Sequence, residues 1–346
     1  MYSGQFLAVI SAALFGISPV LCKLVIGEMS PALLAGLLYL GSGVGLHFLL
    51  LFQGKKSIEE VRRLSPKQRL ALLGSILSGG IVAPLFLAYG IKFGTASEVS
   101  LLLNFETVAT TLIAWFVFKE HVGPGVWGGK ALIVLGSVFV ILKTEGTLAF
   151  SFAGLLVILA CAFWGIDNNL TRDIEELPAT VLASIKGFGA GTFNTLLALA
   201  LSTGTATVPQ VAGSLLIGAM SYGMSLVLFV EALRRIGSAR TSTLFAIGPF
   251  IGTFLSVIIL GERPPATYWV AASLMLAGIA LLQREMHGHP HTHEELSHSH
   301  KHLHDEHHQH GHAEGEGTEP HDHPHMHEPI THSHVHWPDI HHRHSH

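Results

Sequence analysis

The sequence predicts an all-α membrane protein in which ten transmembrane helices form two inverted five-helix repeats, followed by a disordered tail. Of the 346 residues, 49% are hydrophobic and only 13% are charged, which is about half the charged share of an ordinary soluble domain. Ten stretches are each apolar enough to cross a bilayer. Residues 284–346 differ completely in composition, because they hold 23 of the 25 histidines.

The ten spans are separated by turn residues. A bilayer-spanning helix needs about 20 mainly apolar residues, and helix N-termini accept proline readily; Pro31, Pro178 and Pro209 each stand at the start of an apolar stretch. No basic segment precedes the first stretch, so we expect a retained helix and not a signal peptide. The spans are expected at 6–26, 31–52, 70–91, 96–118, 125–143, 151–171, 179–202, 209–231, 239–260 and 266–283.

Basic residues predict the orientation of the chain, because Lys and Arg collect in the cytosolic loops of membrane proteins. The loop at 53–69 and the segment 234–240 are rich in Lys and Arg, and ten alternating helices place both on one side of the membrane. Both termini are therefore expected in the cytosol, and the protein in the inner (cytoplasmic) cell membrane. The only cysteines, Cys22 and Cys161, fall in apolar stretches, which disfavours a disulfide scaffold.

The chain also repeats itself. Ser78 matches Ser221 at an offset of 143 residues, and Trp127 matches Trp269 at 142. Because a unit of five helices is odd, the second copy enters the membrane from the opposite side, as in many secondary transporters. The expected units are residues 1–143, residues 144–283 and the tail, residues 284–346.

The motifs that open the two repeats resemble those of the drug/metabolite transporter superfamily, specifically its EamA-like branch. They are Ala13-Leu14-Phe15-Gly16 and Ala162-Phe163-Trp164-Gly165, and the likeness covers about residues 5–283. The resemblance implies a secondary carrier, and it leaves the solute open because the superfamily moves amino acids, nucleotide sugars, drugs and other metabolites. One departure concerns the family's proline-centred fourth helix. Glu106 occupies the position that Pro249 holds in the second repeat, so a loosened helix is expected only in the second half.

Charged side chains inside the spans are candidates for solute binding, because an ionised group in hydrocarbon is costly unless it faces a polar cavity or a partner. Glu106, near the middle of its span, is expected to release a proton or neutralise a cation, and Asp167 is the second candidate. A structural or interfacial carboxyl is the alternative for each. The resemblance implies that the helices of Asp167 and of its repeat equivalent, Ser18, line the central cavity. The candidate substrate cavity comprises Glu106, Asp167, Asn104, Asn168, Ser18 and Trp164.

Four other charged residues are expected to have structural roles. Lys130 and Lys186 can extend their ammonium groups towards the headgroups. Glu98 and Glu231 stand near the ends of spans and are expected to be solvated or paired with neighbouring basic residues. The sequence has no nucleophile elbow, no nucleotide-binding glycine loop and no zinc-binding cysteine pair, so no catalytic residue is proposed and the chain is not expected to be an enzyme.

The tail is expected to be disordered when free, because it has almost no aliphatic side chains. Its histidines alternate with other residues, and in an extended chain residues two apart lie on one side, where two imidazoles can converge on one ion. Neutral imidazole suits zinc, nickel, cobalt and copper. A pH-responsive polyelectrolyte is the alternative. The candidate metal ligands are His287, His289, His291, His293, His298, His300, His302, His304, His321, His323, His325, His327, His332, His334 and His336.

Two functions therefore compete. The first is a gradient-coupled exporter of a small organic metabolite, whose cytosolic tail binds a divalent transition metal. The alternative is an efflux or uptake carrier of such a metal itself, for example nickel, cobalt or zinc; a membrane metal sensor without transport is a third reading. No cofactor is expected beyond the metal on the tail. The expected partners are the lipid bilayer and a small-molecule or metal-ion substrate; a homodimer is left open, and the absence of a strongly basic footprint excludes nucleic acid.

Overall fold

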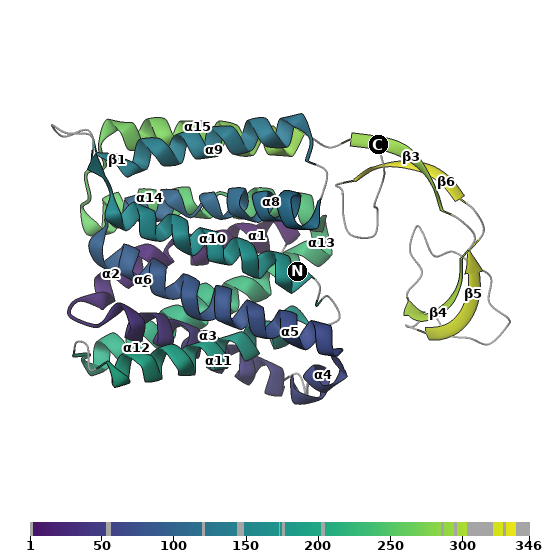
Figure 1. Cartoon of the computed structure of the whole chain (residues 1–346), viewed down its shortest axis with the longest axis horizontal. Helices are drawn as coiled ribbons and strands as arrows, with labels where there is room; N and C mark the ends of the chain where they lie inside the picture. The colour runs from purple at the N-terminus through teal and green to yellow at the C-terminus, as the bar shows by residue number, and fades with distance from the viewer. Residues whose placement is uncertain are drawn as a thin grey trace. The chain divides into compact units, whose positions relative to one another are not determined.

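The chain divides into two compact units, Met1–Glu285 and Met286–His346. The first unit is a bundle of helices, shown in Figure 1. The computed structural model describes residues 3–52, 57–119, 122–143, 149–172, 174, 177–201, 205–284, 287–293, 296–302, 321–327 and 330–336.

Helices fill the first half of the bundle. Proline stands in the first turn of several of them, where its missing N–H costs no hydrogen bond, and Ser65 and Gln68 form a capping box at the start of α5. The elements are α1 (Gly4–Gly16), α2 (Ser18–Ile26), α3 (Pro31–Phe52), α4 (Ser57–Arg63), α5 (Pro66–Ser75), the π-helix η1 (Ile76–Val82), α6 (Ala83–Phe93), α7 (Ala96–Leu102), α8 (Phe105–Phe118) and α9 (Pro124–Ile141).

The second half follows a short antiparallel pair of strands, in which Leu142 pairs with Phe150. Thr207 and Gln210 repeat the capping box at the start of α12. The elements are β1 (Leu142–Lys143), β2 (Ala149–Phe150), α10 (Phe152–Arg172), α11 (Ala179–Ala200), α12 (Val208–Ile217), the π-helix η2 (Gly218–Met224), α13 (Ser225–Phe245), α14 (Gly248–Leu260) and α15 (Ala266–Arg284).

Seven helical stretches among the described residues are long and apolar enough to cross a membrane. Two shorter apolar helices, Gly248–Leu260 and Ala266–Leu282, add to them, and the 22-residue α11 coincides with the remaining predicted span. The predicted count of ten stays a prediction. The seven are Gly4–Ile26, Pro31–Phe52, Pro66–Phe93, Ala96–Val117, Pro124–Ile141, Phe152–Thr171 and Val208–Ala232.

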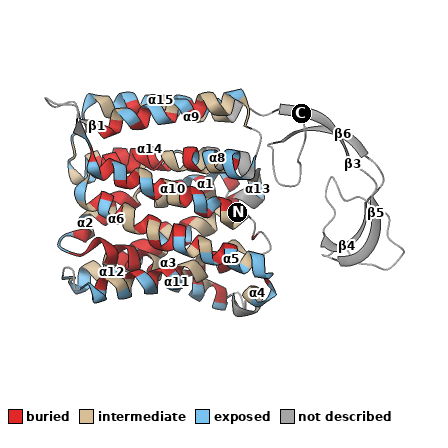
Figure 2. Cartoon of the chain, viewed as in Figure 1, coloured by how far each residue is buried: buried red, intermediate tan, exposed pale blue. Residues whose placement is uncertain are grey.

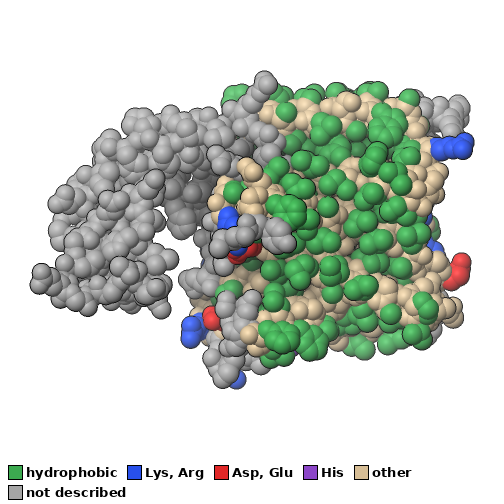
Figure 3. Space-filling view, turned by 180° about the vertical axis from the view of Figure 1, so that it is seen from behind, with side chains coloured by type: hydrophobic (Ala, Val, Ile, Leu, Met, Phe, Trp, Pro, Cys, Tyr) green, Lys and Arg blue, Asp and Glu red, His purple; other side chains and the backbone are tan. Residues whose placement is uncertain are grey.

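The outer surface of the bundle is suited to lipid. Large apolar side chains such as Phe116, Leu196 and Ile258 are more than half exposed, and Figure 3 shows hydrophobic side chains covering the visible face between two ends that carry the charged groups. A soluble protein rarely exposes so continuous an apolar surface. The membrane-embedded fold predicted from the composition is confirmed.

Equivalent helices of the two halves pack against each other. The second helices pair as α3 with α11, the fifth helices pair as α9 with α15, and α1 packs on α13 as α10 packs on α6. Buried residues are denser on α10 than on α15 (Figure 2). Glycine permits the close approach: a Cβ added to Gly129 would lie 2.7 Å from the backbone oxygen of Gly278. This reciprocal pairing is what an inverted repeat requires.

The fourth helix is interrupted in both halves, which corrects the expectation from Glu106. α7 ends at Leu102 and α8 begins at Phe105, just as α13 ends at Phe245 and α14 begins at Gly248. Proline at position 249 explains the second break. In the first half the Asn104 amide nitrogen donates to the Leu101 oxygen at 3.2 Å, so an asparagine side chain stabilises a turn that the second half makes with proline.

The halves differ in two other places. The first helix is divided between α1 and α2 at Ile17, before Pro19, whereas its equivalent α10 is continuous. The third and fourth helices are separated at Gly94-Thr95, whereas α13 runs unbroken through the equivalent Gly237. The two repeats therefore have the same order of helices and different shapes.

The tail was expected to be disordered, and the structure assigns four strands within it: β3 (His287–His293) pairs with β6 (Ile330–His336), and β4 (Leu296–His302) with β5 (His321–His327). The register places histidine opposite histidine at six positions, for example His289 opposite His334. His304 lies outside the described residues. Because two-stranded pairs are marginally stable on their own in water, disorder of the metal-free tail stays a prediction.

Candidate functional site

Glu106 lies in the first turn of α8, halfway along the span Ala96–Val117. Its carboxylate accepts a hydrogen bond from the Asn168 amide nitrogen at 2.9 Å, and the same nitrogen donates to the Thr110 hydroxyl at 3.1 Å. Glu106 is half-buried and Asn168 is exposed. A polar side chain exposed at this depth of a spanning helix requires water or a polar ligand as its neighbour.

Asp167 forms an ion pair with Lys186 of α11. The Lys186 ammonium donates to Asp167 Oδ2 at 2.5 Å, and the two side chains are 14% and 7% exposed, respectively. The Thr171 hydroxyl, one turn further along α10, donates to Asp167 Oδ1 at 3.0 Å. Thr171 is also 3.3 Å from the Ser75 hydroxyl of α5. Asp167 is therefore paired and hydrogen-bonded, as a buried carboxylate must be.

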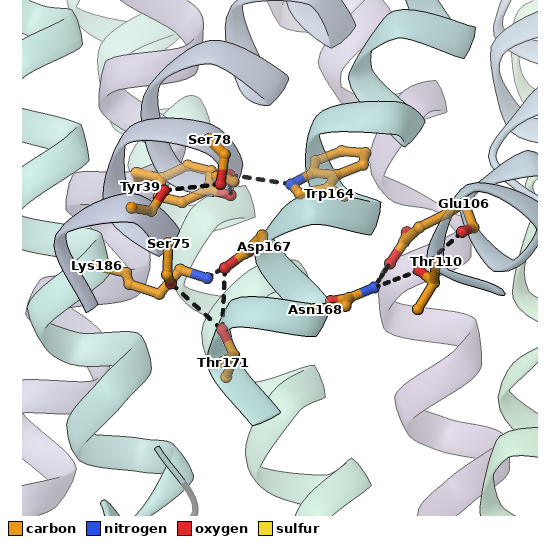
Figure 4. Close-up of polar contacts among 12 residues, drawn as sticks. Tyr39, Ser75, Ser78, Glu106, Thr110, Trp164, Asp167, Asn168, Thr171 and Lys186 are labelled. Carbon is orange, nitrogen blue, oxygen red and sulfur yellow. Dashed lines mark hydrogen bonds and ion pairs between the residues drawn. The ribbon is translucent and has the colours of Figure 1, made fainter. Parts of the chain in front are cut away.

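The neighbouring residues Asp167 and Asn168 point to opposite sides of α10, the first towards α11 and the second towards α8 (Figure 4). Glu106 also interacts electrostatically with Asp167 and Lys186. We name Glu106, Thr110, Asp167, Asn168 and Lys186 the α10 polar group. It holds two carboxylates and one ammonium within membrane-spanning helices.

The π-helix η1 provides a backbone acceptor beside this group. In a π-helix the oxygen of residue i accepts from residue i+5, and for Gly79 that residue is Pro84, which has no N–H. Two side chains satisfy the Gly79 oxygen instead: the Tyr39 hydroxyl donates at 2.7 Å and the Trp164 indole at 3.0 Å. The backbone of η1 is thereby tied to α3 and to α10 (Figure 4).

Gly79 is also where η1 touches the ion pair. A Cβ added at this position would overlap the carboxylate of Asp167. The absence of a side chain at Gly79 therefore makes the room in which Asp167 meets Lys186.

The structure brings some of the predicted cavity residues together and separates others. Glu106, Asp167 and Asn168 share the α10 polar group, with Trp164 three residues earlier on the same helix. Asn104 is 3% exposed, and its amide faces Leu101 and the Met275 sulfur, 3.8 Å away. Ser18 is buried at the start of α2 beside the Tyr222 phenol.

The structure places the four charged residues that were expected to be structural in different environments. Glu231 pairs with Arg235 at 2.7 Å, as expected. Lys130 does not extend to the headgroups: it is 8% exposed and donates to the Thr107 oxygen at 2.9 Å. Lys186 is a member of the α10 polar group. Glu98 is only 4% exposed, which excludes solvation, the first of its two expected environments, and it interacts electrostatically with the basic residue Lys23.

Sequence reasoning missed Lys186, Tyr39 and Thr110 as members or neighbours of the polar group. A lysine inside a predicted span was a visible signal, and the rule that an intramembrane charge needs a partner would have directed the search to Asp167. Tyr39 and Thr110 carry no such signal, since hydroxyl groups are common in spanning helices.

The arrangement offers charged and hydrogen-bonding groups to a small polar solute. An ammonium group can bind a carboxylate, a half-buried carboxylate can bind an ammonium group, and the amide of Asn168 serves either. Among the residues whose side chains the structure describes, no group of three His, Cys, Asp or Glu residues is placed to hold a metal ion.

Comparison with known proteins points to transport. The model of the "EamA-like transporter family" matches residues 2–142 and again residues 151–284. A crystal structure of a protein with 16% sequence identity has the same fold, with a TM-score of 0.61 over 81% of this chain and 96% of that chain.

Three curated proteins are similar over most of their length. An "uncharacterized transporter" of Methanothermobacter thermautotrophicus is 27% identical over 80% of this chain and 85% of that protein. A "probable amino-acid metabolite efflux pump" of Salmonella typhimurium is 28% identical over 79% and 92%, respectively. A "probable terminal-alkyne amino-acid exporter" of Streptantibioticus cattleyicolor is 24% identical over 63% and 74%.

Proposed function

Because this chain belongs to the EamA-like transporter family and has the fold of a multi-pass membrane permease, we propose that it is a secondary carrier that exports a small zwitterionic metabolite of the amino-acid class. Two of the relatives are named for the export of amino-acid metabolites or of an unusual amino acid. A family of permeases gives no reason to expect enzymatic activity.

The α10 polar group is the observation that carries this proposal. An amino acid has an ammonium group and a carboxylate close together, and Glu106 and Lys186 offer the complementary charges from α8 and α11. Opposite charges built into the site lower the cost of moving a zwitterion out of water. A neutral or singly charged solute would gain less from this arrangement.

The alternative, a divalent metal as the transported solute, is less well supported. Asp167 is already neutralised by Lys186, and a second cation at that carboxylate would meet the lysine ammonium. The remaining donors nearby are the Glu106 carboxylate and amide and hydroxyl oxygens, and an all-oxygen set suits hard cations better than nickel, cobalt or zinc.

We predict that Glu106→Gln lowers export by about 10 to 100-fold, because a charge-assisted hydrogen bond is worth about 1.5–3 kcal/mol. Glutamine keeps the shape and can still accept from Asn168, so insertion and thermal stability should be unchanged. Proteoliposome flux of radiolabelled neutral L-amino acids measures the effect. The matched control is Glu231→Gln, which removes an exposed carboxylate outside the polar group. Equal flux in the Glu106 variant and the wild type would exclude Glu106 from the mechanism.

We further propose that both termini face the cytosol, in the inner membrane, and that the tail binds divalent transition metal ions there. The basic loop at 53–69 supports the orientation. The histidine content of the tail supports metal binding. The strand register also supports it, since it pairs histidine with histidine and directly opposite residues of an antiparallel pair lie on the same face.

We expect removal of residues 287–346 to leave insertion and metal-free transport unchanged, because the tail forms a unit of its own and has almost no aliphatic side chains. Calorimetric titration of the full chain with zinc, nickel, cobalt or copper should show uptake of several ions near neutral pH. Binding should be lost below about pH 6, since imidazole ligates only when deprotonated.

The truncated chain is the control for that titration, and it should bind none of these ions. If the full chain and the truncated chain take up equal amounts of metal, the tail is not a metal-binding segment. If truncation changes amino-acid flux without added metal, the tail takes part in transport itself.

A further inference from the structure

The two π-helices occupy equivalent places in the bundle. η1 packs against α10 and α11, which are the first and second helices of the second repeat. η2 packs against α1 and α3, which belong to the first and second helices of the first repeat. Each π-helix is part of the third helix of its own repeat. The inverted repeat therefore creates two related sites, one beside each π-helix.

Each side chain described above around η1 has an equivalent around η2. The offset between the repeats is 149 residues in the first helix, from the opening motifs, 147 in the second, from Pro31 and Pro178, and 143 in the third. At these positions the η1 site has a charged pair and a glycine that makes room for it, whereas the η2 site has neutral side chains and a ring in place of the glycine. The equivalent pairs are Trp164 and Phe15, Asp167 and Ser18, Lys186 and Tyr39, and Gly79 and Tyr222.

The rings beside η2 contact one another. The Phe15 ring centroid lies 6.0 Å from that of Tyr222, with 69° between the ring planes, and 5.4 Å from that of Phe245, the last residue of α13. The Tyr39 ring centroid, from α3, lies 6.0 Å from that of Tyr222. We name Phe15, Tyr39, Tyr222 and Phe245 the η2 aromatic group.

The η2 aromatic group lies inside the bundle and is not completely covered. Phe15 contacts both η2 and the end of α13, and Tyr39 contacts both π-helices. All four rings are nevertheless only half-buried. An interior ring with uncovered surface can gain contacts with a further apolar group, which leaves water when it packs there.

Tyr39 connects the η2 aromatic group to the α10 polar group. Its hydroxyl donates to the Gly79 oxygen at 2.7 Å, at the residue whose missing side chain makes room for Asp167. Figure 4 shows Tyr39 and Trp164 beside the ion pair of Asp167 and Lys186. The Tyr39 ring meanwhile contacts Tyr222. The charged groups and the rings are therefore neighbours, separated by the length of one tyrosine side chain.

The difference between the two sites matches a solute with two unlike ends. Two equal sites would offer the same groups to both ends. Here the η1 site offers charges and the η2 site offers rings. An amino acid with a large apolar side chain has the complementary pair of ends, since its ammonium and carboxylate lie together at one end and its apolar surface at the other.

We propose that the η2 aromatic group binds the side chain of the transported amino acid, and that the carrier selects amino acids with an aromatic or large apolar side chain. This inference rests on the proposed carrier function and adds the class of side chain to it. The α10 polar group binds what all amino acids share and does not distinguish between them. The rings do, because they reward apolar area and accept a further ring at the spacing they already show.

Export of radiolabelled L-phenylalanine and L-alanine by the full chain in proteoliposomes tests the proposal. The apparent affinity for L-phenylalanine should be about 10- to 100-fold higher, as burial of a phenyl group predicts. Equal apparent affinities for the two probes would overturn this inference and leave the carrier function standing. Export of neither probe would overturn the proposed function, and this inference with it.

Phe15→Leu removes the ring that contacts both Tyr222 and Phe245 and keeps an apolar side chain. The ratio of the two apparent affinities should fall by about 3- to 10-fold, because aromatic pair contacts are lost. Phe86→Leu is the matched control: Phe86 is also half-buried and stacks on Phe163 with the ring centroids 5.8 Å apart, outside both groups. It should keep the wild-type ratio. An unchanged ratio in Phe15→Leu, with both fluxes lowered in proportion, would mean a structural role and overturn the proposal.

Thermal unfolding of the purified full chain gives a second measurement that needs no flux and reports whether each variant folds. A ligand raises the Tm according to its affinity, so L-phenylalanine should raise the Tm of the wild type more than L-alanine does at equal concentration. Tyr222→Phe keeps the ring and should keep this difference, whereas Tyr222→Leu should lose most of it. A wild-type difference in Tyr222→Leu, or its loss in Tyr222→Phe, would show that the ring is not the binding element.

Discussion

Lys186→Met is expected to stop transport and to destabilise the bundle at the same time. Methionine has a similar length and no charge, so Asp167 would remain buried without its partner. Removal of one member of a buried ion pair typically lowers the free energy of unfolding by about 3–5 kcal/mol. The loss of a charged contact to the solute should weaken its apparent affinity by about 30-fold or more.

The double variant Asp167→Asn/Lys186→Met separates the two effects. It removes both charges, so most of the stability should return while transport stays lost. Thermal unfolding in detergent and proteoliposome flux measure the two quantities. Arg235→Gln is the control, because the exposed Arg235–Glu231 pair should contribute only about 0–1 kcal/mol. Normal transport by the double variant would show that the pair only supports the fold.

Gly79→Ala is expected to have the second large effect. The new methyl group would overlap the Asp167 carboxylate, so Asp167 would have to leave Lys186, or η1 would have to move away from α10. Overpacking of this kind costs about 1–3 kcal/mol, and transport should fall as it does for Lys186→Met.

Gly128→Ala is the matched control for that variant. An added Cβ at Gly128 has no neighbour within 4 Å, and alanine favours a helix over glycine by up to about 1 kcal/mol. Gly128→Ala should therefore be as stable as the wild type or slightly more stable, with unchanged flux. If Gly79→Ala has the same stability and flux as Gly128→Ala, the close contact between η1 and Asp167 is not needed for transport.

Much of the helical framework could be predicted, because apolar length and proline placement are local properties of the chain. The breaks in the helices were harder. Pro19 and Pro249 signal two of the breaks. The interruption at Asn104 depends on one side-chain hydrogen bond. A glycine alone does not predict a break either, because α6 ends before Gly94 whereas α13 continues through the equivalent Gly237. Tertiary packing selects between these outcomes.

The candidate site was predictable in part for a related reason. Glu106 and Asp167 were found because an unpaired charge in hydrocarbon is costly, a rule that acts on single residues. The rule does not say which partner each carboxylate meets, so Lys186 was assigned to the headgroups and its ion pair with Asp167 was missed. That error concerns a contact between two different helices.

The two π-helices bear on the history of the chain. A π-helical turn accommodates more residues than an α-helical turn, so it commonly marks a place where the chain has gained a residue. η1 begins at Ile76 and η2 at Gly218, and the offset of 143 at Ser78 is unchanged at Gly94. Neither half has gained or lost a residue relative to the other across this segment. The simplest origin is one insertion in an ancestral five-helix unit, before its gene was duplicated.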